Sequence, residues 1–307
     1  MQKTLKSDIV FTGVGLHSGN NATLRVRPAA ADTGIWFSRT DIPYKDGLIS
    51  ANWKFAVHTA LCTRIVNRNG IGVSTVEHLM AALAGCGISN AILELDGPEV
   101  PIMDGSALEF VRSFLDTGLI EQAEPVHAVE ILKTVEVKEN GAYAALVPFS
   151  GIEMKFEIDF PDAAIGQQSK SLNLANGSFV NELCDSRTFC RNSDVALMWS
   201  NGLALGGTFY NAVVVDGAKV LSPGGMRYAD EPVRHKMLDA MGDLALAGGP
   251  IIGRYIGRCA GHTVTNKLLR KLFSQPKSFR VIDCSQEMSE RLPGAGLVQE
   301  DTPIFIK

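Results

Sequence analysis

Three side chains in one predicted helix could bind a metal ion. His235, Asp239 and Asp243 are spaced four residues apart in a segment that we expect to be helical from about 231 to 247. An α-helix turns by about 100° per residue, so this spacing places the three side chains along one face. A histidine and an aspartate one turn apart can bind a single zinc ion. A solvated polar face with an ordinary His–Asp pair would show the same pattern, so both interpretations stay open.

A second predicted helix places a histidine next to an acidic residue. Ser74 and Glu77 have the spacing of a capping box before an apolar segment that ends at Gly85. His78 lies away from the apolar side of that segment, among small residues that leave room for an ion or a substrate. Glu77 is either the acid of the capping box or a general base that acts on water beside a metal ion. The pair strengthens the case for a metal site.

Other hydrolase motifs are missing from the sequence. It contains no HExxH, no HxE followed by PCxxC, and no GxSxG, so zincin, nucleobase deaminase and serine hydrolase chemistries lose support. The glycine-rich segment 13–19 also fails as a dinucleotide-binding loop, because its spacing is not GxGxxG and a strand-like pattern follows it. We expect a turn between two strands there.

Composition excludes several classes of protein. A net charge of −4 and a pI of about 5.9 give no basic surface for nucleic acid. No apolar run is long enough to span a membrane, and the start of the sequence does not resemble a secretion signal. The six cysteines form no CxxC pair, which is typical of reduced thiols in the cytoplasm. We therefore expect a cytoplasmic monomer that is large enough to fold without a metal, so that any bound metal is catalytic.

Predicted strands and helices alternate along the chain. Apolar–polar alternation or continuous apolar residues indicate strands at 23–27, 91–95, 152–158 and 212–215. Apolar periodicity, in most cases with capping residues or terminal glycines, indicates helices at 76–84, 107–117, 231–247 and 263–273. This mixture predicts an α+β fold.

A short polar segment divides the chain into two parts. Residues 121–125 follow a helix end and precede a new strand, so we interpret them as a linker. Glu77-His78 before one apolar helix is echoed by Arg234-His235 before another, which favours two similar halves. We therefore predict three parts: a first α+β domain at 1–122, a second at 127–275, and a C-terminal tail at 276–307.

Six sequence motifs follow one another in a specific order. They are GVGLHSG at 13–19, STVEHLMAALAG at 74–85, PIMDGS at 101–106, SRTF at 186–189, VRHKMLDAMGD at 233–243 and GH at 261–262. Each motif is weak alone, but the ordered set makes residues 2 to about 275 resemble the UDP-3-O-acyl-N-acetylglucosamine deacetylase family of lipid A biosynthesis. The resemblance implies an active site at the interface of two similar domains, each a small sheet packed with helices in a β-α-α-β sandwich.

The resemblance implies a metal site to which both domains contribute. His78, His235 and Asp239 would be the ligands of a catalytic Zn²⁺ with a fourth position open. Fe²⁺ could use the same ligands. The implied reaction is the hydrolysis of an amide, which removes the N-acetyl group of UDP-3-O-acyl-N-acetylglucosamine and releases acetate.

The resemblance also implies how four side chains act in catalysis. Glu77 would be the general base that takes a proton from water, and His262 would be the protonated partner that stabilises the oxyanion and then acts as an acid. Asp243 would hold His262 in one tautomer and favour its charge. Thr188 would donate a hydrogen bond to the tetrahedral oxyanion.

Substrate contacts follow from the same resemblance. Lys236 would meet the diphosphate or the charge that develops nearby, and Asp159 and Phe160 would contact the uridine. Phe160 could instead be an aromatic residue at the edge of the core. An apolar, glycine-interrupted insert near 190–212 would form the passage for the acyl chain. The other residues assigned to the substrate are Phe189, Leu203 and Ala204.

Two positions depart from the family pattern. Cys190-Arg191-Asn192 follows Phe189 where glycine and an apolar residue are common, which leaves the acyl-chain preference open. Cys259 stands where lysine is often expected, although Arg258 could replace that lysine in binding the diphosphate. Two rival interpretations remain: a metal hydrolase that acts on another amide or ester, and a sugar-nucleotide-binding protein with a vestigial metal site.

Overall fold

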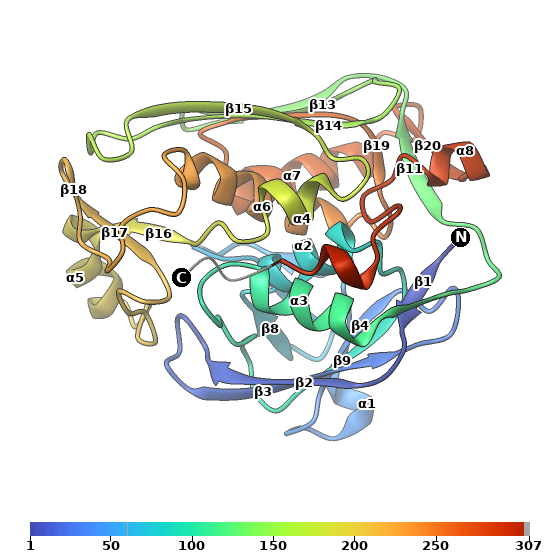
Figure 1. Ribbon diagram of the computed structural model, residues 1–307, viewed down its shortest axis with the longest axis horizontal. Helices are drawn as coiled ribbons and strands as arrows, with labels where there is room; N and C mark the ends of the chain where they lie inside the picture. Colours follow the sequence, from blue (N-terminus) through green and yellow to red (C-terminus); the bar gives the residue numbers. More distant parts are fainter. Residues whose placement is uncertain (60, 304–307) are drawn as a thin grey trace.

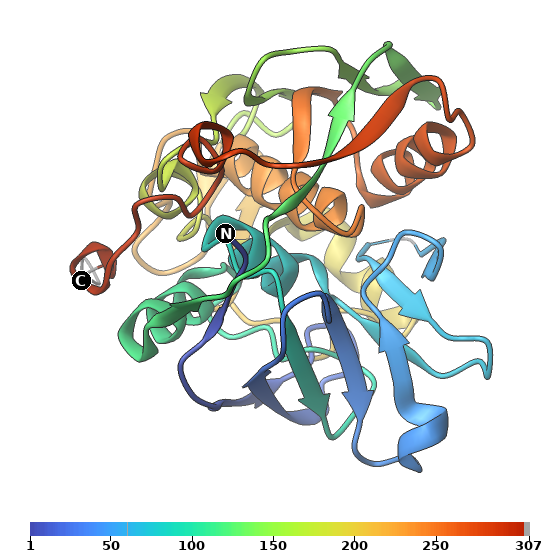
Figure 2. The same ribbon diagram turned by 90° about the vertical axis from the view of Figure 1, so that its right-hand side faces the viewer.

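The computed structural model describes residues 1–59 and 61–303 (Figure 1). The central helices lie between two larger sheets, a five-stranded sheet in an N-terminal part, residues 1–121, and a seven-stranded sheet in a C-terminal part, residues 127–303 (Figures 1 and 2). This combination confirms the predicted α+β class. Within the described residues, no helix is both long and apolar enough to cross a membrane.

A five-stranded sheet forms one side of the N-terminal part. Its order is β2 (Ile9–Val14), β3 (Asn21–Pro28), β9 (Ala91–Leu95), β4 (Ile35–Arg39) and β5 (Leu48–Ser50). The register sets Leu24 opposite Leu95 and Val26 opposite Leu93, and all four side chains are buried on one face. The turn expected between two strands at 13–19 joins β2 to β3. The other elements of this part are β1 (Lys3–Leu5), α1 (Tyr44–Gly47), β6 (Ala56–Val57), β7 (Arg64–Val66), β8 (Gly72–Ser74), α2 (Glu77–Gly85), α3 (Leu108–Thr117) and β10 (Leu119–Glu121).

Strand β19 (Ile251–Arg258) is the centre of the sheet in the C-terminal part. It pairs antiparallel with β13 (Ala142–Val147) and parallel with β11 (His127–Ile131) and β14 (Ile152–Asp159). β20 (Phe279–Asp283) pairs with β11, so the segment after residue 275 adds a strand to this sheet. The other elements are β12 (Val135–Glu139), β15 (Gln167–Asn173), α4 (Ser178–Glu182), β16 (Phe189–Arg191), α5 (Asn192–Ser200), β17 (Val213–Asp216), β18 (Lys219–Val220), α6 (Glu231–Ala245), α7 (His262–Phe273), α8 (Gln286–Ser289) and a 3₁₀-helix (Gln299–Asp301).

The segment from Phe189 to Val220 forms an arm at one end of the molecule, on the left in Figure 1. Strands β16, β17 and β18 make a separate three-stranded sheet. Helix α5 contains no buried residue and exposes Leu197 and Trp199. The insert predicted near 190–212 therefore lies within this arm.

Helices α2 and α6 pack against each other at the centre of the molecule (Figure 1). His235, Asp239 and Asp243 of α6 are only 2%, 4% and 1% exposed. The solvated polar face considered for this helix is therefore wrong, because the N-terminal part covers it. Carboxylates are rarely buried to this extent without partners, so the face requires a specific arrangement of neighbours.

The capping box predicted at Ser74 and Glu77 is also wrong. Ser74 belongs to β8, and α2 begins after Val76 without a side chain that caps its N-terminus. The Glu77 carboxylate instead accepts a hydrogen bond at 3.0 Å from the backbone N–H of Thr63. A tertiary contact has replaced the local one, and Glu77 is free of the helix-cap role.

Candidate metal centre and catalytic site

Three predicted metal ligands converge between α2 and α6. His78 comes from α2, and His235 and Asp239 come from successive turns of α6. Oδ1 of Asp239 lies 3.4 Å from Nε2 of His78 and 3.2 Å from Nε2 of His235. One ligand atom from each residue lies within 4.8 Å of the others, and all three residues are buried. The structure therefore brings together the three side chains that the family resemblance implies as ligands.

The polar atoms of this cluster fit a metal ion. Asp239 Oδ1 and His78 Nδ1 are buried and have no hydrogen-bond partner among the described residues. Nδ1 of His235 donates to the carbonyl oxygen of Ser186 at 3.0 Å, which leaves the Nε2 lone pair directed at the cluster. A buried carboxylate oxygen that faces two imidazole nitrogens without a hydrogen bond is the arrangement that a shared cation would satisfy.

The protonation states of the cluster also suit ligation. Burial lowers the pKa of His78 and keeps its imidazole neutral. Burial alone would raise the pKa of Asp239, but neighbouring His235 and Lys236 outweigh it and hold that pKa well below the usual range. A neutral imidazole at His78 and an ionised carboxylate at Asp239 are the forms that bind a metal ion.

Glu77 is buried beside this cluster. Burial raises the pKa of Glu77 to about 7, with Asp239 and Asp243 adding to the rise and His262 opposing it. A carboxylate with a pKa near neutrality can both accept and return a proton. The side chain is held by its hydrogen bond from Thr63, a residue that no motif in the sequence had indicated.

His262 begins α7 and faces Glu77 across the site. Its Nδ1 donates to Oδ2 of Asp243 at 2.9 Å, and its Nε2 lies 3.7 Å from Oε1 of Glu77 and 3.9 Å from Oδ2 of Asp239. Burial would lower the pKa of His262, but Asp243 and Glu77 raise it to about 9. Asp243 also accepts a short hydrogen bond from Oγ1 of Thr63. Thr63 therefore connects the acidic partner of His262 to Glu77.

Lys236 contacts the metal cluster directly. Its ammonium donates to Oδ2 of Asp239 at 2.6 Å. Burial would lower the pKa of Lys236, but Asp239 outweighs it and raises that pKa. The lysine is thus a fixed positive charge at the edge of the cluster.

Two aromatic side chains extend the site away from α6. The Phe189 ring lies 6.3 Å from the His235 ring and 5.3 Å from the Phe160 ring, both in edge-to-face geometry. Asp159, next to Phe160, is exposed and accepts a hydrogen bond from Gln167. Thr188 is fixed through its backbone, whose N–H donates to Gly105 at 2.7 Å. Phe189, which follows Thr188, thus contacts both His235 of the metal cluster and Phe160.

A buried ion pair, which the sequence had not indicated, supports this segment. Arg187 is 6% exposed and donates to Glu231, which is fully buried at the start of α6. The same glutamate accepts from the backbone N–H of Arg187. The SRTF motif therefore contains the residue that fixes Thr188 and Phe189 relative to α6.

Leu203 and Ala204 lie in the arm, next to the β2–β3 turn. The Ala204 N–H donates to Nδ1 of His17 at 3.3 Å. Of the two departures from the family pattern, Cys190 is partly buried on β16 and Cys259 is exposed with a φ of 46°. Arg258 lies 3.3 Å from Glu157.

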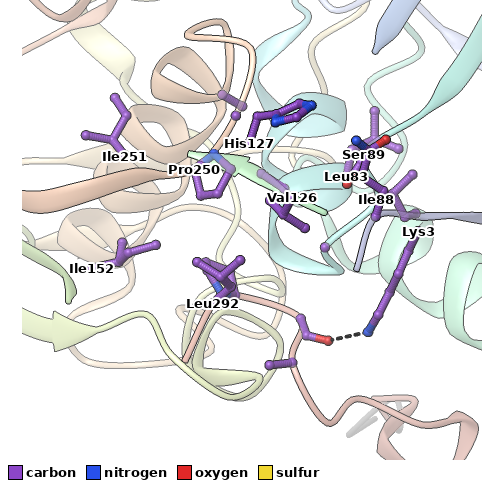
Figure 3. Close-up of a pocket in the computed structure, with 18 of the residues that line it drawn as sticks. Lys3, Leu83, Ile88, Ser89, Val126, His127, Ile152, Pro250, Ile251 and Leu292 are labelled. Atoms are coloured by element: carbon purple, nitrogen blue, oxygen red, sulfur yellow. Dashed lines mark hydrogen bonds between the residues drawn. The ribbon is translucent and has the colours of Figure 1, made fainter. Parts of the chain in front are cut away.

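A large cavity lies away from the metal-site residues. It has a volume of about 1290 Å³ and runs between the two parts of the molecule, near Leu83, Ile88, Val126, Ile251 and Leu292 (Figure 3). None of the three metal-site residues lines it. The chemistry of the side chains, rather than the size of a cavity, therefore locates the candidate site.

Comparisons with known proteins agree with this chemistry. The family model described as LpxC, UDP-3-O-acyl N-acetylglycosamine deacetylase, matches residues 2–274. The UDP-3-O-acyl-N-acetylglucosamine deacetylase of Phenylobacterium zucineum is 46% identical over 289 residues, which cover 94% of this chain and 99% of the relative. The enzymes of that name from Actinobacillus succinogenes and Shewanella denitrificans are 44% and 43% identical, with 95% and 93% of this chain and 95% and 94% of the relatives covered.

Proposed function

Because the chain belongs to the UDP-3-O-acyl N-acetylglycosamine deacetylase family, we propose that His78, His235 and Asp239 bind the metal ion on which its reaction depends. The protein is a deacetylase that hydrolyses the N-acetyl group of UDP-3-O-acyl-N-acetylglucosamine, a step of lipid A biosynthesis. The observation that carries the metal proposal is the convergence of two imidazoles and one carboxylate whose buried oxygen has no hydrogen bond. Zn²⁺ suits this ligand set best, and Fe²⁺ is the alternative.

Glu77 is the proposed general base. An amide is a poor electrophile, and Zn²⁺ in this site would polarise its carbonyl group and lower the pKa of water. Glu77 lies next to the ligand His78 in the sequence and does not itself belong to the ligand set. With a pKa of about 7, its carboxylate accepts a proton from the attacking water.

His262 is the proposed acid. It is charged at neutral pH because its pKa is about 9, so it stabilises the oxyanion as it forms. The same group then protonates the sugar nitrogen as the amide bond breaks. Asp243 holds the Nδ1–H of His262, which directs Nε2 to the space beside Glu77. Thr188 is the proposed hydroxyl donor to the same oxyanion.

The remaining substrate contacts are proposed for residues around the cluster. Lys236 balances negative charge near the ligand Asp239, and Asp159 and Phe160 bind the uridine. Phe189 supports this proposal because its ring lies between His235 and Phe160. In the arm, the acyl passage is lined by Leu203 and Ala204.

We further propose that the two parts of the molecule are the two similar domains of the family. Each contains a sheet with helices on its inner side, and α2 and α6 meet between them (Figure 2). The catalytic groups come from both, so the site is completed only when the two domains pack. All the proposed catalytic groups come from one chain, which supports a monomer, and a cytoplasmic location stays a prediction.

The test is an assay of acetate release on protein purified without chelator, combined with elemental analysis. We expect one equivalent of metal per chain and acetate release from UDP-3-O-acyl-N-acetylglucosamine. His235→Ala should lose both, and the exposed His58→Ala control should lose neither. Full acetate release by a metal-free His235→Ala protein would contradict the proposed metal site.

A further inference from the structure

A buried carboxylate outside the catalytic site joins two loops. Glu99 is 4% exposed and lies between β9 and α3. Its Oε1 accepts from the backbone N–H of His17 at 2.8 Å and from Oγ1 of Thr75 at 2.9 Å. Its Oε2 accepts from the backbone N–H of Ser18 at 2.8 Å. Both oxygens are thus engaged, as expected of a buried carboxylate.

These hydrogen bonds fix the turn between β2 and β3. Consecutive backbone N–H groups that point at one carboxylate form a concave anion site, here made by His17 and Ser18. Gly15 closes against the same group, since a Cβ at this position would lie 2.4 Å from Oε2 of Glu99. The turn therefore has little freedom to move while the Glu99 side chain is in place.

The same turn holds the arm of the C-terminal part. The N–H groups of Leu205 and Gly206 donate to the carbonyl oxygens of His17 and Leu16 at 3.2 and 3.0 Å, and Ala204 donates to the His17 ring. The backbones touch, because a Cβ at Gly206 would lie 2.3 Å from the carbonyl oxygen of Gly15. Helix α5 of the arm contributes no buried residue of its own. The turn is therefore a major anchor for residues 203–207.

We propose that Glu99 is a positioning residue for substrate selectivity: it holds the β2–β3 turn, and the turn in turn sets where residues 203–207 lie beside the acyl chain. This inference rests on the proposed role of Leu203 and Ala204 in the acyl passage. Glu99 does not touch the ion cluster, and its effect should appear in the binding of the acyl chain rather than in bond breaking.

The test is Glu99→Gln, which keeps the shape of the side chain but replaces one acceptor oxygen with a donor. We expect KM for a substrate with a long acyl chain to rise about tenfold, as for the loss of one hydrogen bond to a charged group. The kcat, the metal content and the KM for a short-chain analogue should change little. Hydrogen exchange of peptides that cover 203–207 should accelerate. Glu94→Gln on β9, whose partners are Arg25 and Arg27, is the matched control and should leave all of these unchanged.

Gly206→Ala provides a second route that leaves Glu99 intact. It should separate the arm from the turn and reproduce both the faster exchange and the selective rise in KM, even where Glu99→Gln fails to fold. Unchanged exchange at 203–207 in both variants would overturn the inference. An equal loss of kcat for both substrates, together with loss of metal, would also overturn the inference. In that case Glu99 would act on helix α2 through its hydrogen bond with Thr75, and not on the arm. A third outcome is faster hydrogen exchange at 203–207 in Glu99→Gln and Gly206→Ala, with a change in KM that does not depend on acyl-chain length in these variants or in Leu203→Trp. That outcome would support the role of Glu99 in fixing the position of the arm and would reject the acyl passage.

Discussion

Gly242 of α6 lies directly against the backbone of Glu77 in α2. A Cβ added to Gly242 would come within 1.9 Å of the Glu77 carbonyl oxygen, a separation that no side chain movement can relieve. The two helices can therefore approach this closely only with glycine at this position. Because Glu77 and His78 belong to one helix and His235 and Asp239 to the other, this contact sets the spacing between the two pairs.

Gly242→Ala should consequently impair stability and metal binding together. We expect a loss of roughly 1–3 kcal/mol in the free energy of unfolding from overpacking, measured by urea denaturation, and a weaker metal affinity measured by competition with a chelator. Gly97→Ala is the control, because nothing lies within 4 Å of a Cβ at that position. Equal stability of the two variants would show that the helices can separate without cost.

Removal of the metal should abolish activity while the fold remains. The protein has an extensive apolar core that spans both parts, so it does not need an ion to fold. We expect dialysis against a chelator to stop turnover and leave the far-ultraviolet circular dichroism unchanged, and added Zn²⁺ to restore activity. Global unfolding on chelation would instead assign the ion a structural role.

Glu77→Gln should separate catalysis from metal binding. The amide cannot accept a proton, so we expect kcat/KM to fall by roughly 10²- to 10⁴-fold, while the metal content stays at that of the wild type. Steady-state kinetics and elemental analysis on the same preparation check this. Near-normal turnover would exclude Glu77 as the base and make Asp243 the next candidate.

Asp243→Asn should move the pH profile of kcat/KM. Activity requires ionised Glu77, with a pKa of about 7, and protonated His262, with a pKa of about 9, so the profile should be bell-shaped. Without the Asp243 charge the pKa of His262 falls, and the alkaline limb moves to lower pH. The same charge helps to raise the pKa of Glu77, so the acidic limb moves in the same direction. A uniform loss of activity with both limbs in place would indicate that Asp243 acts only on structure.

A bulky residue in the proposed acyl passage should affect substrates according to their chain length. Leu203→Trp is expected to weaken a long-chain substrate by about tenfold or more in kcat/KM, which corresponds to the burial of about two methylene groups, and to spare a truncated analogue. Leu197→Trp on α5, where the side chain is 66% exposed, is the control. Equal losses for both substrates would remove the passage assignment.

The periodic parts of the site could be predicted from the sequence. His235 and Asp239 are one turn apart, so the helix itself brings them together, and the ordered motifs placed His78 with them. Thr63 could not be found in this way. It links Glu77 to Asp243 through contacts that join residues 14 and 180 positions apart, and no local pattern records such a distance.

Local rules also failed where tertiary packing competes with them. Ser74 and Glu77 have the spacing of a capping box. In the structure Ser74 belongs to strand β8, and the Glu77 carboxylate accepts a hydrogen bond from Thr63. The polar face of α6 resembles a solvated surface in the sequence, because periodicity shows which side of a helix is polar but not whether another helix covers that side. In both cases the partner comes from another part of the chain, so only the packed structure determines the environment of the side chain.

The division of the site between α2 and α6 has a consequence for the biogenesis of the enzyme. The ribosome completes His78 long before it reaches His235 and Asp239, and an incomplete chain therefore contains only one of the three proposed ligands. The proposed three-ligand site is complete only after translation has passed α6 and the two helices have packed. The proposed metal would thus be bound by the folded chain rather than by a partly synthesised one.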